Sequence, residues 1–501
     1  MPNTFYGVQT GPTTWGQVNL YDSFTSSLPS SDFNEDGITD ILWRRSAFIG
    51  SNRGQVAIWI VNGASIINGG FLPASPKGTE DPSFWSINAS YGDTQSYIPF
   101  GEFSNAGNFL GYPLPKLDFD GNGTSDIFWR KDGGSEIAIW NMQGATVING
   151  AFLQGVPRTD LGENLADWFV QPLVDFNGDG KTDLAWRKSS FSLNSNAGEN
   201  AIWIMDGPTI ANGGFLPISP TGSAPRDWSE GFADFNGDGK TDYFWSKSNS
   251  AATSPGQKAI WIMDGPNIVN GGFLQANPRP EQPPSSWFSV FADFNGDSKT
   301  DFFWQNNTTG EKAIWIMDGP NIVNGGFLPS TPISGSNPND WDTAFGDFNG
   351  DSKTDILWEN SVNGTKAVWI MDGPAIVNGG FLPTSPKTGT NGEDWDSFFA
   401  DFNGDGKTDI LWNNTPDDQF AIWIMDGPTI IDGGFLPDAP ITGQNGWQFE
   451  FRELNGDGKT DIYWTSSTGT KAAWLMDGPD IIGGGFFAQP NPTGEVPEVL
   501  V

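Results

Sequence analysis

One acidic pattern recurs eight times in this chain and constrains its fold more than any other feature. The copy "DFNGDGKTDILW" runs from Asp401 to Trp412. The eight copies are 52 to 86 residues apart and start at Asp32, Asp118, Asp175, Asp234, Asp293, Asp347, Asp401 and Glu453. A second phrase, such as "AIWIMDGPTIANGGFLP" from Ala201, follows each copy. Self-similarity at this spacing is typical of propellers and solenoids.

Tryptophan gives an independent count of the repeats. The 24 tryptophans form three sets of eight. One set ends the acidic pattern and comprises Trp43, Trp129, Trp186, Trp245, Trp304, Trp358, Trp412 and Trp464. One set lies in the second phrase and comprises Trp59, Trp140, Trp203, Trp261, Trp315, Trp369, Trp423 and Trp474. One set precedes the pattern and comprises Trp15, Trp85, Trp168, Trp228, Trp287, Trp341, Trp395 and Trp447. Trp15 and Trp85 stand 17 and 33 residues ahead of their patterns, which indicates insertions in the first two repeats.

Each repeat predicts four short β-strands. One strand leads into the acidic pattern, one leaves it, and "KAIWIM" and "NIVNGGFLP" form two more around a "DGP" turn. Alternating apolar residues between Gly, Pro and Asp turns are β signals. We therefore predict an all-β fold, an eight-bladed β-propeller of four-stranded antiparallel blades. Seven blades plus an extra repeat, and a right-handed solenoid, are the alternatives; solenoid repeats are usually shorter and need capped ends.

A single propeller domain is predicted to span residues 1–501. The approximate blades are 15–80, 81–160, 161–223, 224–283, 284–338, 339–392, 393–444 and 445–490.

The acidic pattern has the spacing of a calcium loop. In the third copy, Asp175, Asn177 and Asp179 stand at positions 1, 3 and 5, Gly180 at position 6 and Asp183 at position 9. Odd positions converge when the backbone curls, and glycine permits the sharp turn. Position 7 can offer its carbonyl oxygen. An EF-hand would need Glu at position 12, where all eight copies have Trp, so we expect a calcium loop between two strands.

We predict one Ca²⁺ per loop, about eight in total, held by oxygens at positions 1, 3, 5, 7 and 9. These residues are Asp32, Asn34, Asp36, Ile38, Asp40, Asp118, Asp120, Asn122, Thr124, Asp126, Asp175, Asn177, Asp179, Lys181, Asp183, Asp234, Asn236, Asp238, Lys240, Asp242, Asp293, Asn295, Asp297, Lys299, Asp301, Asp347, Asn349, Asp351, Lys353, Asp355, Asp401, Asn403, Asp405, Lys407, Asp409, Glu453, Asn455, Asp457, Lys459 and Asp461. The alternative is an acidic turn whose Asp and Asn side chains only cap their own backbone.

Some copies depart from the pattern. Ser298 and Ser352 replace glycine at position 6, which we expect to weaken those turns. Glu453 has a longer arm at position 1 and is expected to distort its site. The second copy exchanges Asp and Asn at Asp120 and Asn122, without a change of charge.

Composition narrows the chemistry. The net charge is −35, which makes nucleic acid and anionic membranes poor partners. The sequence has no Cys and no His, so thiolate chemistry and the usual ligands of zinc, copper and iron are absent. Oxygen donors remain, and they suit a hard cation such as Ca²⁺.

The "DFNGDGKTD" loops resemble the FG-GAP/VCBS repeat family over nearly the whole chain. In that family the loop joins the first two strands of a propeller blade and binds calcium. The integrin α-chain headpiece is a related propeller, usually of seven blades. The resemblance implies this fold and this ion, and it does not specify a function.

Because the repeats are nearly alike, they favour multivalent binding over a single catalytic centre. The leading hypothesis is a non-catalytic, calcium-stabilised propeller for adhesion or for binding glycans or proteins; some FG-GAP-like propellers are lectins. Most of the tryptophans are expected in the core. A second hypothesis is a self-assembling subunit of an extracellular coat or filament.

A third hypothesis is an enzyme that looks like an eight-bladed polysaccharide lyase. Without His, its base would be Lys, Arg, Tyr or a carboxylate of raised pKa. The candidates are Arg44, Arg45, Tyr91, Tyr97, Tyr112, Arg130 and Lys131. The segments 79–117 and 160–167 could form a binding edge instead.

An extracellular or cell-surface location is expected, because weak calcium modules work at the millimolar calcium found there. No N-terminal signal peptide is visible, since Arg44 is the first basic residue. No apolar run approaches the ~18 residues that cross a bilayer. The tail "GEVPEVLV" is interpreted as a frayed end or a final strand, with an export signal as the alternative. Ring closure through a strand near residues 4–9 is left open.

Overall fold

The structure is a computed structural model, and it describes most of the protein. The described residues are 6–9, 15–18, 31–45, 56–77, 81, 85–88, 117–131, 136–153, 155–158, 163, 167–189, 197–249, 251, 253–387, 395–414, 419–437, 440, 447–466, 470–487 and 497–499.

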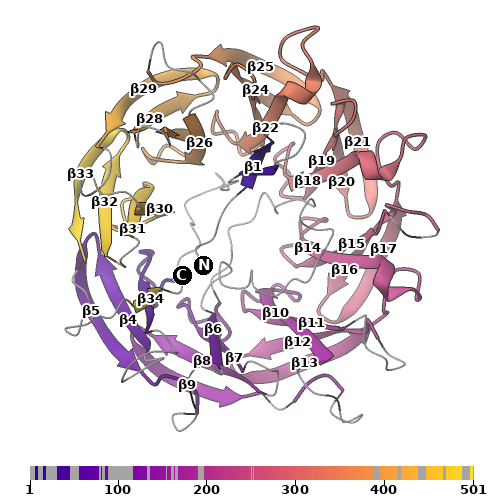
Figure 1. The fold of residues 1–501 in the computed structure, drawn as a ribbon. Helices are drawn as coiled ribbons and strands as arrows, with labels where there is room; N and C mark the ends of the chain where they lie inside the picture. Colours follow the sequence, from indigo (N-terminus) through magenta and orange to yellow (C-terminus); the bar gives the residue numbers. More distant parts are fainter. Residues whose placement is uncertain are drawn as a thin grey trace.

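Eight four-stranded sheets surround a central axis (Figure 1). Every pairing within them is antiparallel, and each sheet is ordered from an inner to an outer strand. The first blade contains β34 (Pro497–Val499), β3 (Ile41–Arg45), β4 (Val56–Asn62) and β5 (Ser65–Leu72). The second contains β6 (Trp85–Asn88), β7 (Ile127–Lys131), β8 (Ile137–Gln143) and β9 (Thr146–Phe152). The third contains β10 (Trp168–Val174), β11 (Asp183–Lys188), β12 (Asn200–Asp206) and β13 (Thr209–Leu216). The fourth contains β14 (Trp228–Ala233), β15 (Asp242–Lys247), β16 (Lys258–Asp264) and β17 (Asn267–Leu274).

The remaining blades repeat this order. The fifth contains β18 (Trp287–Ala292), β19 (Asp301–Asn306), β20 (Lys312–Asp318) and β21 (Asn321–Leu328). The sixth contains β22 (Trp341–Gly346), β23 (Asp355–Asn360), β24 (Lys366–Asp372) and β25 (Ala375–Leu382). The seventh contains β26 (Trp395–Ala400), β27 (Asp409–Asn414), β28 (Gln419–Asp426) and β29 (Thr429–Leu436). The eighth contains β30 (Trp447–Arg452), β31 (Asp461–Ser466), β32 (Lys471–Asp477) and β33 (Asp480–Phe486). The predicted eight-bladed propeller is confirmed, and the alternative of seven blades is wrong.

Among the residues that the structure describes, three short 3₁₀ turns precede inner strands, at η6 (Pro225–Asp227), η7 (Pro284–Ser286) and η8 (Pro338–Asp340). In each turn proline takes an early position, where its missing N–H costs no hydrogen bond. No helix among the described residues has the length and apolarity that a membrane crossing requires.

The first blade differs from the prediction at its inner strand. The expected strand from Trp15 forms β2 (Trp15–Val18), which pairs with β1 (Tyr6–Gln9) in a separate two-stranded sheet. The C-terminal strand β34 pairs with β3 instead, in the register Trp43 to Val499. An edge strand needs only an extended partner with matching N–H and C=O groups, which a segment distant in sequence can supply. The tail is therefore a final strand, and it closes the ring.

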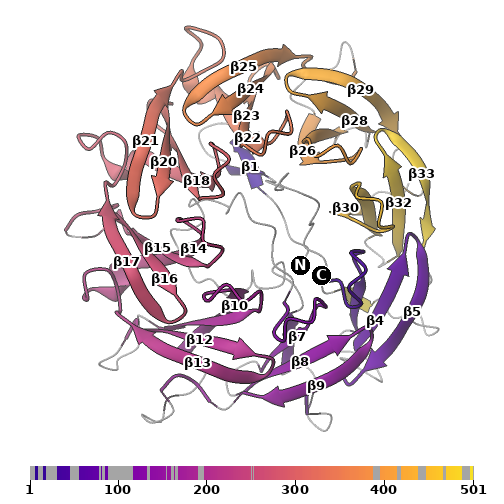
Figure 2. The ribbon, with the colours of Figure 1, turned by 180° about the vertical axis from the view of Figure 1, so that it is seen from behind.

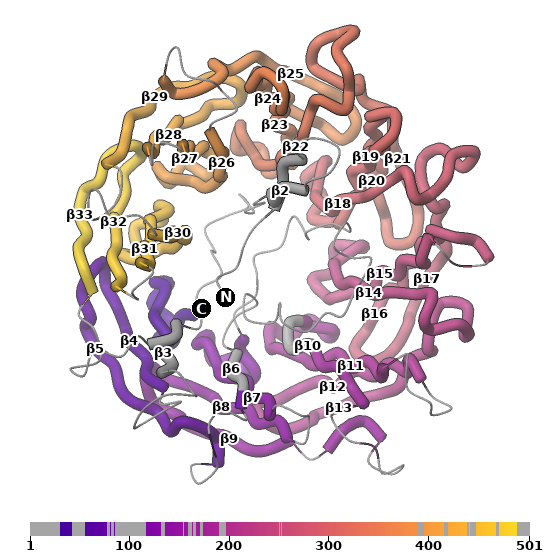
Figure 3. The backbone as a smooth tube through the Cα atoms, viewed as in Figure 1, coloured from indigo at the N-terminus to yellow at the C-terminus, as the bar shows by residue number. Residues whose placement is uncertain are grey.

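The path of the backbone brings the first and last blades side by side. Figure 3 shows β33 of the last blade next to β5 of the first. Viewed from behind, β1 again lies inside the ring beside β22 (Figure 2).

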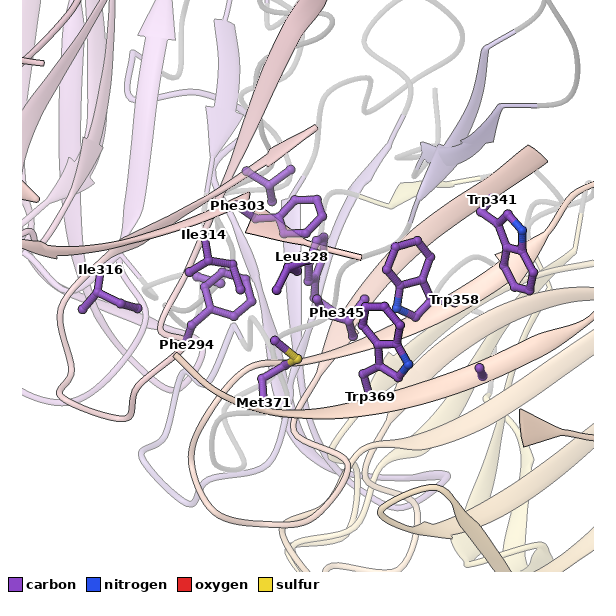
Figure 4. Packing of buried hydrophobic residues seen from close by; sticks show 14 residues of the cluster. Phe294, Phe303, Ile314, Ile316, Leu328, Trp341, Phe345, Trp358, Trp369 and Met371 are labelled. Atoms are coloured by element: carbon purple, nitrogen blue, oxygen red, sulfur yellow. The ribbon is translucent and has the colours of Figure 1, made fainter. Parts of the chain in front are cut away.

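Large aromatic side chains fill the spaces between blades. Figure 4 shows Phe294 and Phe303 of the fifth blade packed with Phe345, Trp358 and Met371 of the sixth. Of the 22 tryptophans whose side chains the structure describes, all except the half-buried Trp447 are buried. Aromatic faces of this size supply much of the apolar area that a repeat buries. The expected core role of the tryptophans is confirmed for these residues.

The "NGGF" phrase of the outer strand makes room for a tryptophan. Gly213 pairs with Trp203 across β12 and β13. A Cβ atom on Gly213 would lie 3.0 Å from Cδ1 of Trp203 and 2.9 Å from the Ile202 carbonyl oxygen. Because glycine leaves this space open, the Trp203 indole fits beside the outermost strand and stays buried.

Candidate metal centre

The acidic loops lie between the inner and second strands of their blades. In an antiparallel meander, this connection and the "DGP" turn between the third and fourth strands emerge at the same end of the sheet. The pairings of the third blade place its loop, residues 175–183, and its turn in this way. All eight acidic loops therefore lie at the same end of the propeller as the eight turns between third and fourth strands.

Position 1 organises the loop backbone. The Oδ1 atom of Asp175 accepts a hydrogen bond from the N–H of Gly178 at 2.7 Å, and Oδ2 accepts one from the N–H of Gly180 at 2.9 Å. The Oδ1 atom of Asn177 accepts from the N–H of Asp179 at 3.2 Å. These bonds curl the loop backbone around the position-1 carboxylate.

Position 9 joins the loop to the third strand. The Asp183 side chain is buried, its Oδ2 accepts from the N–H of Phe176 at 2.9 Å, and its Oδ1 accepts from the N–H of Met205 at 2.9 Å. The same pair of bonds is made by Asp40, Asp126, Asp242, Asp301, Asp355, Asp409 and Asp461. The sequence pattern predicts these residues as ligands, and it does not reveal their hydrogen bonds to the third strand.

Burial raises the pKa of every position-9 carboxyl, and the two backbone hydrogen bonds oppose the rise only in part. The raised pKa is about 7 for Asp40, Asp183, Asp242 and Asp461. It is about 8 for Asp126, Asp301, Asp355 and Asp409. Repulsion from the carboxylates at positions 1 and 5 adds to the rise in Asp183. A bound cation would reverse this balance, because it favours the ionised form.

The second loop shows the convergence most directly. Oxygens of Asp118, Asp120 and Asp126, at positions 1, 3 and 9, lie within 4.8 Å of one another. An oxygen that accepts one backbone N–H keeps a second lone pair for a cation. The other seven loops have Asn at position 3, whose amide oxygen is also a donor to a hard ion. The donor sets therefore fit Ca²⁺.

The lysines at position 7 turn toward the hairpin. The Nζ atom of Lys353 lies 2.8 Å from Oδ1 of Asp372 in the "DGP" turn of its own blade. The equivalent pairs are Lys181–Asp206, Lys240–Asp264, Lys299–Asp318, Lys407–Asp426 and Lys459–Asp477. In two repeats the ammonium also lies 4.0 or 3.7 Å from the position-5 carboxylate, at Asp297 and Asp405. Each of these ion pairs links an acidic loop to the "DGP" turn of its own blade.

Backbone hydrogen bonds join each loop to the next blade. The N–H of Thr182 donates to the carbonyl of Asp118 at 2.7 Å, and the N–H of Gly207 donates to the carbonyl of Phe119 at 2.7 Å. The same two bonds occur between every pair of neighbouring blades. Thr39 and Gly63 of the first blade donate to Glu453 and Leu454 of the eighth. The loops therefore form a closed ring that holds the blades together at one end.

The loops whose sequences depart from the acidic pattern keep the backbone geometry of the other loops. Ser298 and Ser352 take φ +64°, in the region that Gly180 and Gly239 occupy at +79° and +78°. This region of φ is unfavourable for residues with a Cβ atom, which is the physical reason for expecting weaker turns at these two serines. The Oε1 and Oε2 atoms of Glu453 accept from Gly456 and Gly458 at 2.6 and 2.7 Å, so its longer arm keeps the position-1 bonds.

Of the residues proposed as catalytic bases, the structure describes the side chains of Arg130 and Lys131. Arg130 and Lys131 belong to strand β7, and Arg44 and Arg45 belong to strand β3. The Nζ atom of Lys131 contacts Glu136 at 3.1 Å and lies 5.6 Å from the centre of the Trp85 ring. Tyr91, Tyr97 and Tyr112 lie outside the described residues, as do most of 79–117 and 160–167.

Fold and loops together define a class of protein, an eight-bladed propeller with repeated acidic loops between its first two strands. A model of the FG-GAP-like repeat matches residues 175–245, 234–304, 293–358 and 401–464. Each match runs from one acidic loop to the tryptophan after the next loop. The protein belongs to the FG-GAP-like repeat family. No curated protein matches it.

Several solved structures are similar to this chain at low sequence identity. A lectin from Agrocybe aegerita that specifically recognises non-reducing terminal N-acetylglucosamine is 13% identical, with a TM-score of 0.46, over 73% of this chain and 92% of the lectin. The dihydro-heme d1 dehydrogenase NirN is 9% identical, with a TM-score of 0.44, over 93% of this chain and 76% of the other. Prolyl oligopeptidase B from Galerina marginata is 12% identical, with a TM-score of 0.40, over 74% and 50%. At this similarity none of them indicates a function.

Proposed function

We propose that this protein is a non-catalytic, calcium-stabilised propeller that works outside the cell in adhesion or in multivalent binding of glycans or proteins. The observation that carries the proposal is the repetition of one oxygen-rich loop geometry in all eight blades, linked into a closed ring. A single catalytic centre would not need eight equivalent copies. A scaffold that offers one weak contact many times would use them.

Calcium supports this role by stabilising the ring. Each loop brings at least three acidic side chains into nine residues, and at least one of them is buried. Mutual repulsion and desolvation oppose that arrangement until a cation compensates the charge. The millimolar calcium outside cells suits loops of this kind, and for that reason an extracellular location is part of the proposal.

The outer strands supply the candidate binding surface. Each carries exposed apolar side chains at equivalent positions, with Phe71 64%, Phe381 57% and Phe435 55% exposed. We call these outer-strand side chains the rim; its phenylalanines are Phe71, Phe152, Phe215, Phe273, Phe327, Phe381, Phe435 and Phe486. Exposed aromatic rings favour contact with the apolar face of a sugar or with a protein. Arg158 and Arg279 cover two of them, with guanidinium carbons 3.9 and 4.2 Å from the centres of the Phe215 and Phe327 rings.

Binding assays on glycan arrays and on immobilised extracellular proteins test the proposal. The double variant Phe381→Ala and Phe435→Ala should lose most of the avidity for any ligand found, with the melting temperature nearly unchanged. A matched double variant of the covered rings, Phe215→Ala and Phe327→Ala, should lose less. Equal binding by both variants and the unaltered protein would exclude the rim as the binding surface.

Self-assembly into a coat or filament is the second candidate, and the unpaired outer strands favour it. The edges of β13, β17, β21 and β25 carry no charged residue, although the whole protein has a net charge of −35. Neutral apolar edge strands promote pairing between copies. Sedimentation in calcium distinguishes the two candidates: regular polymers favour a structural subunit, and a stable monomer favours the binding role.

The non-catalytic part of the proposal has its own test. A polysaccharide lyase removes a proton beside a uronate carboxylate and leaves an unsaturated sugar. Lys131, one of the candidate bases, is engaged by Glu136 and Trp85. We expect no ultraviolet absorbance from unsaturated products when the calcium-loaded protein is incubated with uronate polysaccharides. Sustained turnover would replace the binding role with an enzymatic one.

A further inference from the structure

The outer strands expose a chemically reactive dipeptide in six blades. Each of these strands places an asparagine directly before a glycine, and every one of the asparagines is exposed. They are Asn68, Asn149, Asn212, Asn270, Asn324 and Asn378. In each case the glycine N–H donates to Oδ1 of its own asparagine, at 2.8 to 2.9 Å.

This hydrogen bond holds a nucleophile next to an electrophile. A carbonyl bond is about 1.23 Å long, so each asparagine Cγ lies within about 4 Å of the glycine nitrogen. Glycine has no Cβ atom to shield that nitrogen. The strand is paired on one side only, because it is the last in its sheet. It can therefore relax locally more easily than an inner strand.

We propose that these six outer-strand asparagines are sites of spontaneous deamidation through a cyclic imide. The glycine nitrogen attacks Cγ and forms a C–N bond, and the amide nitrogen of the asparagine leaves as ammonia, taking up the proton that the glycine nitrogen loses. Water then opens the imide. Opening at one carbonyl gives aspartate, and opening at the other gives isoaspartate, with one more carbon in the backbone. Only water is consumed.

The seventh blade shows that the strand accepts a carboxylate at this position. Asp432 occupies the place of the asparagine, and the N–H of Gly433 donates to its Oδ1 at 2.8 Å. The aspartate product therefore keeps the hydrogen bond of the asparagine. Each conversion adds one negative charge to the rim, three residues before an exposed phenylalanine such as Phe327 or Phe381.

The acidic loops contain a matched set of Asn–Gly pairs in a different environment. In six loops the position-3 asparagine also precedes a glycine, at Asn177, Asn236, Asn295, Asn349, Asn403 and Asn455. There the glycine N–H donates to the position-1 carboxylate at 2.6 to 2.7 Å. These asparagines are half-buried. The structure thus holds the loop nitrogens on a different acceptor and directs the reaction to the outer strands.

Peptide mapping by mass spectrometry tests the proposal on the full-length protein. The protein is aged at mildly alkaline pH in calcium, and in parallel in urea, where both sets of Asn–Gly pairs are unfolded. Aspartate is read from the mass gain, and isoaspartate from labelling with an isoaspartyl methyltransferase. Asn324→Gln provides the control variant, because the longer side chain would have to close a less favourable six-membered ring. Gly325→Ala is unsuitable, since its Cβ atom would lie 2.8 Å from the Ile314 carbonyl oxygen.

The expected result is a ratio of outer-strand to loop deamidation at least about tenfold higher in the folded protein than in urea. Asn324→Gln should remove the product at position 324 and leave the other five sites unchanged. A ratio that folding leaves unchanged or lowers would overturn the proposal. A contrary result would be product at position 324 in the Asn324→Gln variant, formed as fast as in the unaltered protein. That result would show that the product does not arise by cyclisation, and it would also contradict the proposal.

Discussion

The aspartate at position 9 combines burial, two backbone hydrogen bonds and a negative charge in one residue. In Asp355 the bonds run to the N–H groups of Phe348 and Met371, both at 2.8 to 2.9 Å. The sequence predicts the residue as a ligand from its spacing alone. Its burial depends on the third strand, which begins eleven residues after it, and no local pattern reveals that.

Raised pKa values at position 9 predict how stability depends on pH without metal. The folded carboxyls have pKa values of about 7 to 8, against 3.8 for an ordinary aspartate. Between these values the folded state binds more protons than the unfolded state, so a rise in pH favours unfolding. In EDTA the free energy of unfolding should therefore be highest near pH 4 and fall as pH rises to about 8. Added calcium should reduce the fall, because it binds the ionised form.

Denaturant titrations from pH 4 to 8, in EDTA and in calcium, measure this effect. Lys258, Lys312 and Lys471 act in the opposite direction, because burial lowers their pKa values to about 8, 8 and 7. Their influence lies mainly above pH 7, so the lower half of the range reports the aspartates. Metal-free stability that increases across this lower half would contradict the assignment.

Serine at position 6 carries a backbone cost that a single substitution removes. Ser298 and Ser352 lie at φ +64°. A Cβ atom at the equivalent Gly239 would meet no atom within 4 Å, so the cost comes from the backbone alone. Ser298→Gly and Ser352→Gly should each raise the free energy of unfolding by about 1 kcal/mol. Gly239→Ser is the matched reverse change and should lower the free energy of unfolding by a similar amount. Thermal melts in which the two kinds of substitution shift stability in the same direction would refute this.

Within a blade, two kinds of contact link the loop to the third hairpin. One is the buried position-9 carboxylate, and the other is the ion pair of position 7 with the "DGP" aspartate. The four strands of each repeat were predictable from apolar alternation and turn residues. The ion pair was not, because its two residues lie 18 to 25 positions apart and meet only when the hairpin folds back.

These two contacts should differ in strength. Asp355→Asn leaves one oxygen to serve two buried N–H groups and should cost about 2 kcal/mol in metal-free buffer. Lys353→Met removes a partly exposed pair, whose Asp372 side chain is 56% exposed, and should cost less than about 1 kcal/mol. Urea unfolding of both variants gives the comparison. A larger loss from Lys353→Met than from Asp355→Asn would reverse the ranking argued here.

At the scale of the molecule, the ring closes in two ways. The loop bonds from Thr39 and Gly63 join the first blade to the eighth, and β34 completes the first sheet. The number of blades followed from counting loops and tryptophans. The identity of the inner strand of the first blade could not be predicted in this way. The tail that supplies it has no acidic loop or tryptophan to align it with the repeats.

Removal of residues 495–501 should destabilise the first blade. The deletion leaves β3 as an unpaired inner edge, and the loss of its few backbone hydrogen bonds should cost about 2 to 3 kcal/mol. A deletion of residues 500–501 leaves β34 intact and is the control. Hydrogen exchange of β3 amides should increase only in the longer deletion. Equal protection in both deletions would show that β34 does not close the sheet in solution.

Calorimetry of the whole protein tests the central claim most directly. Thermal unfolding is recorded in EDTA and in calcium, followed by a titration that counts the bound ions. Because an ion that binds only the folded state raises stability by mass action, calcium should increase the melting temperature markedly, with about eight ions bound per molecule. A melting temperature that does not respond to calcium, together with no bound ion, would contradict the account and leave the loops as hydrogen-bonded turns.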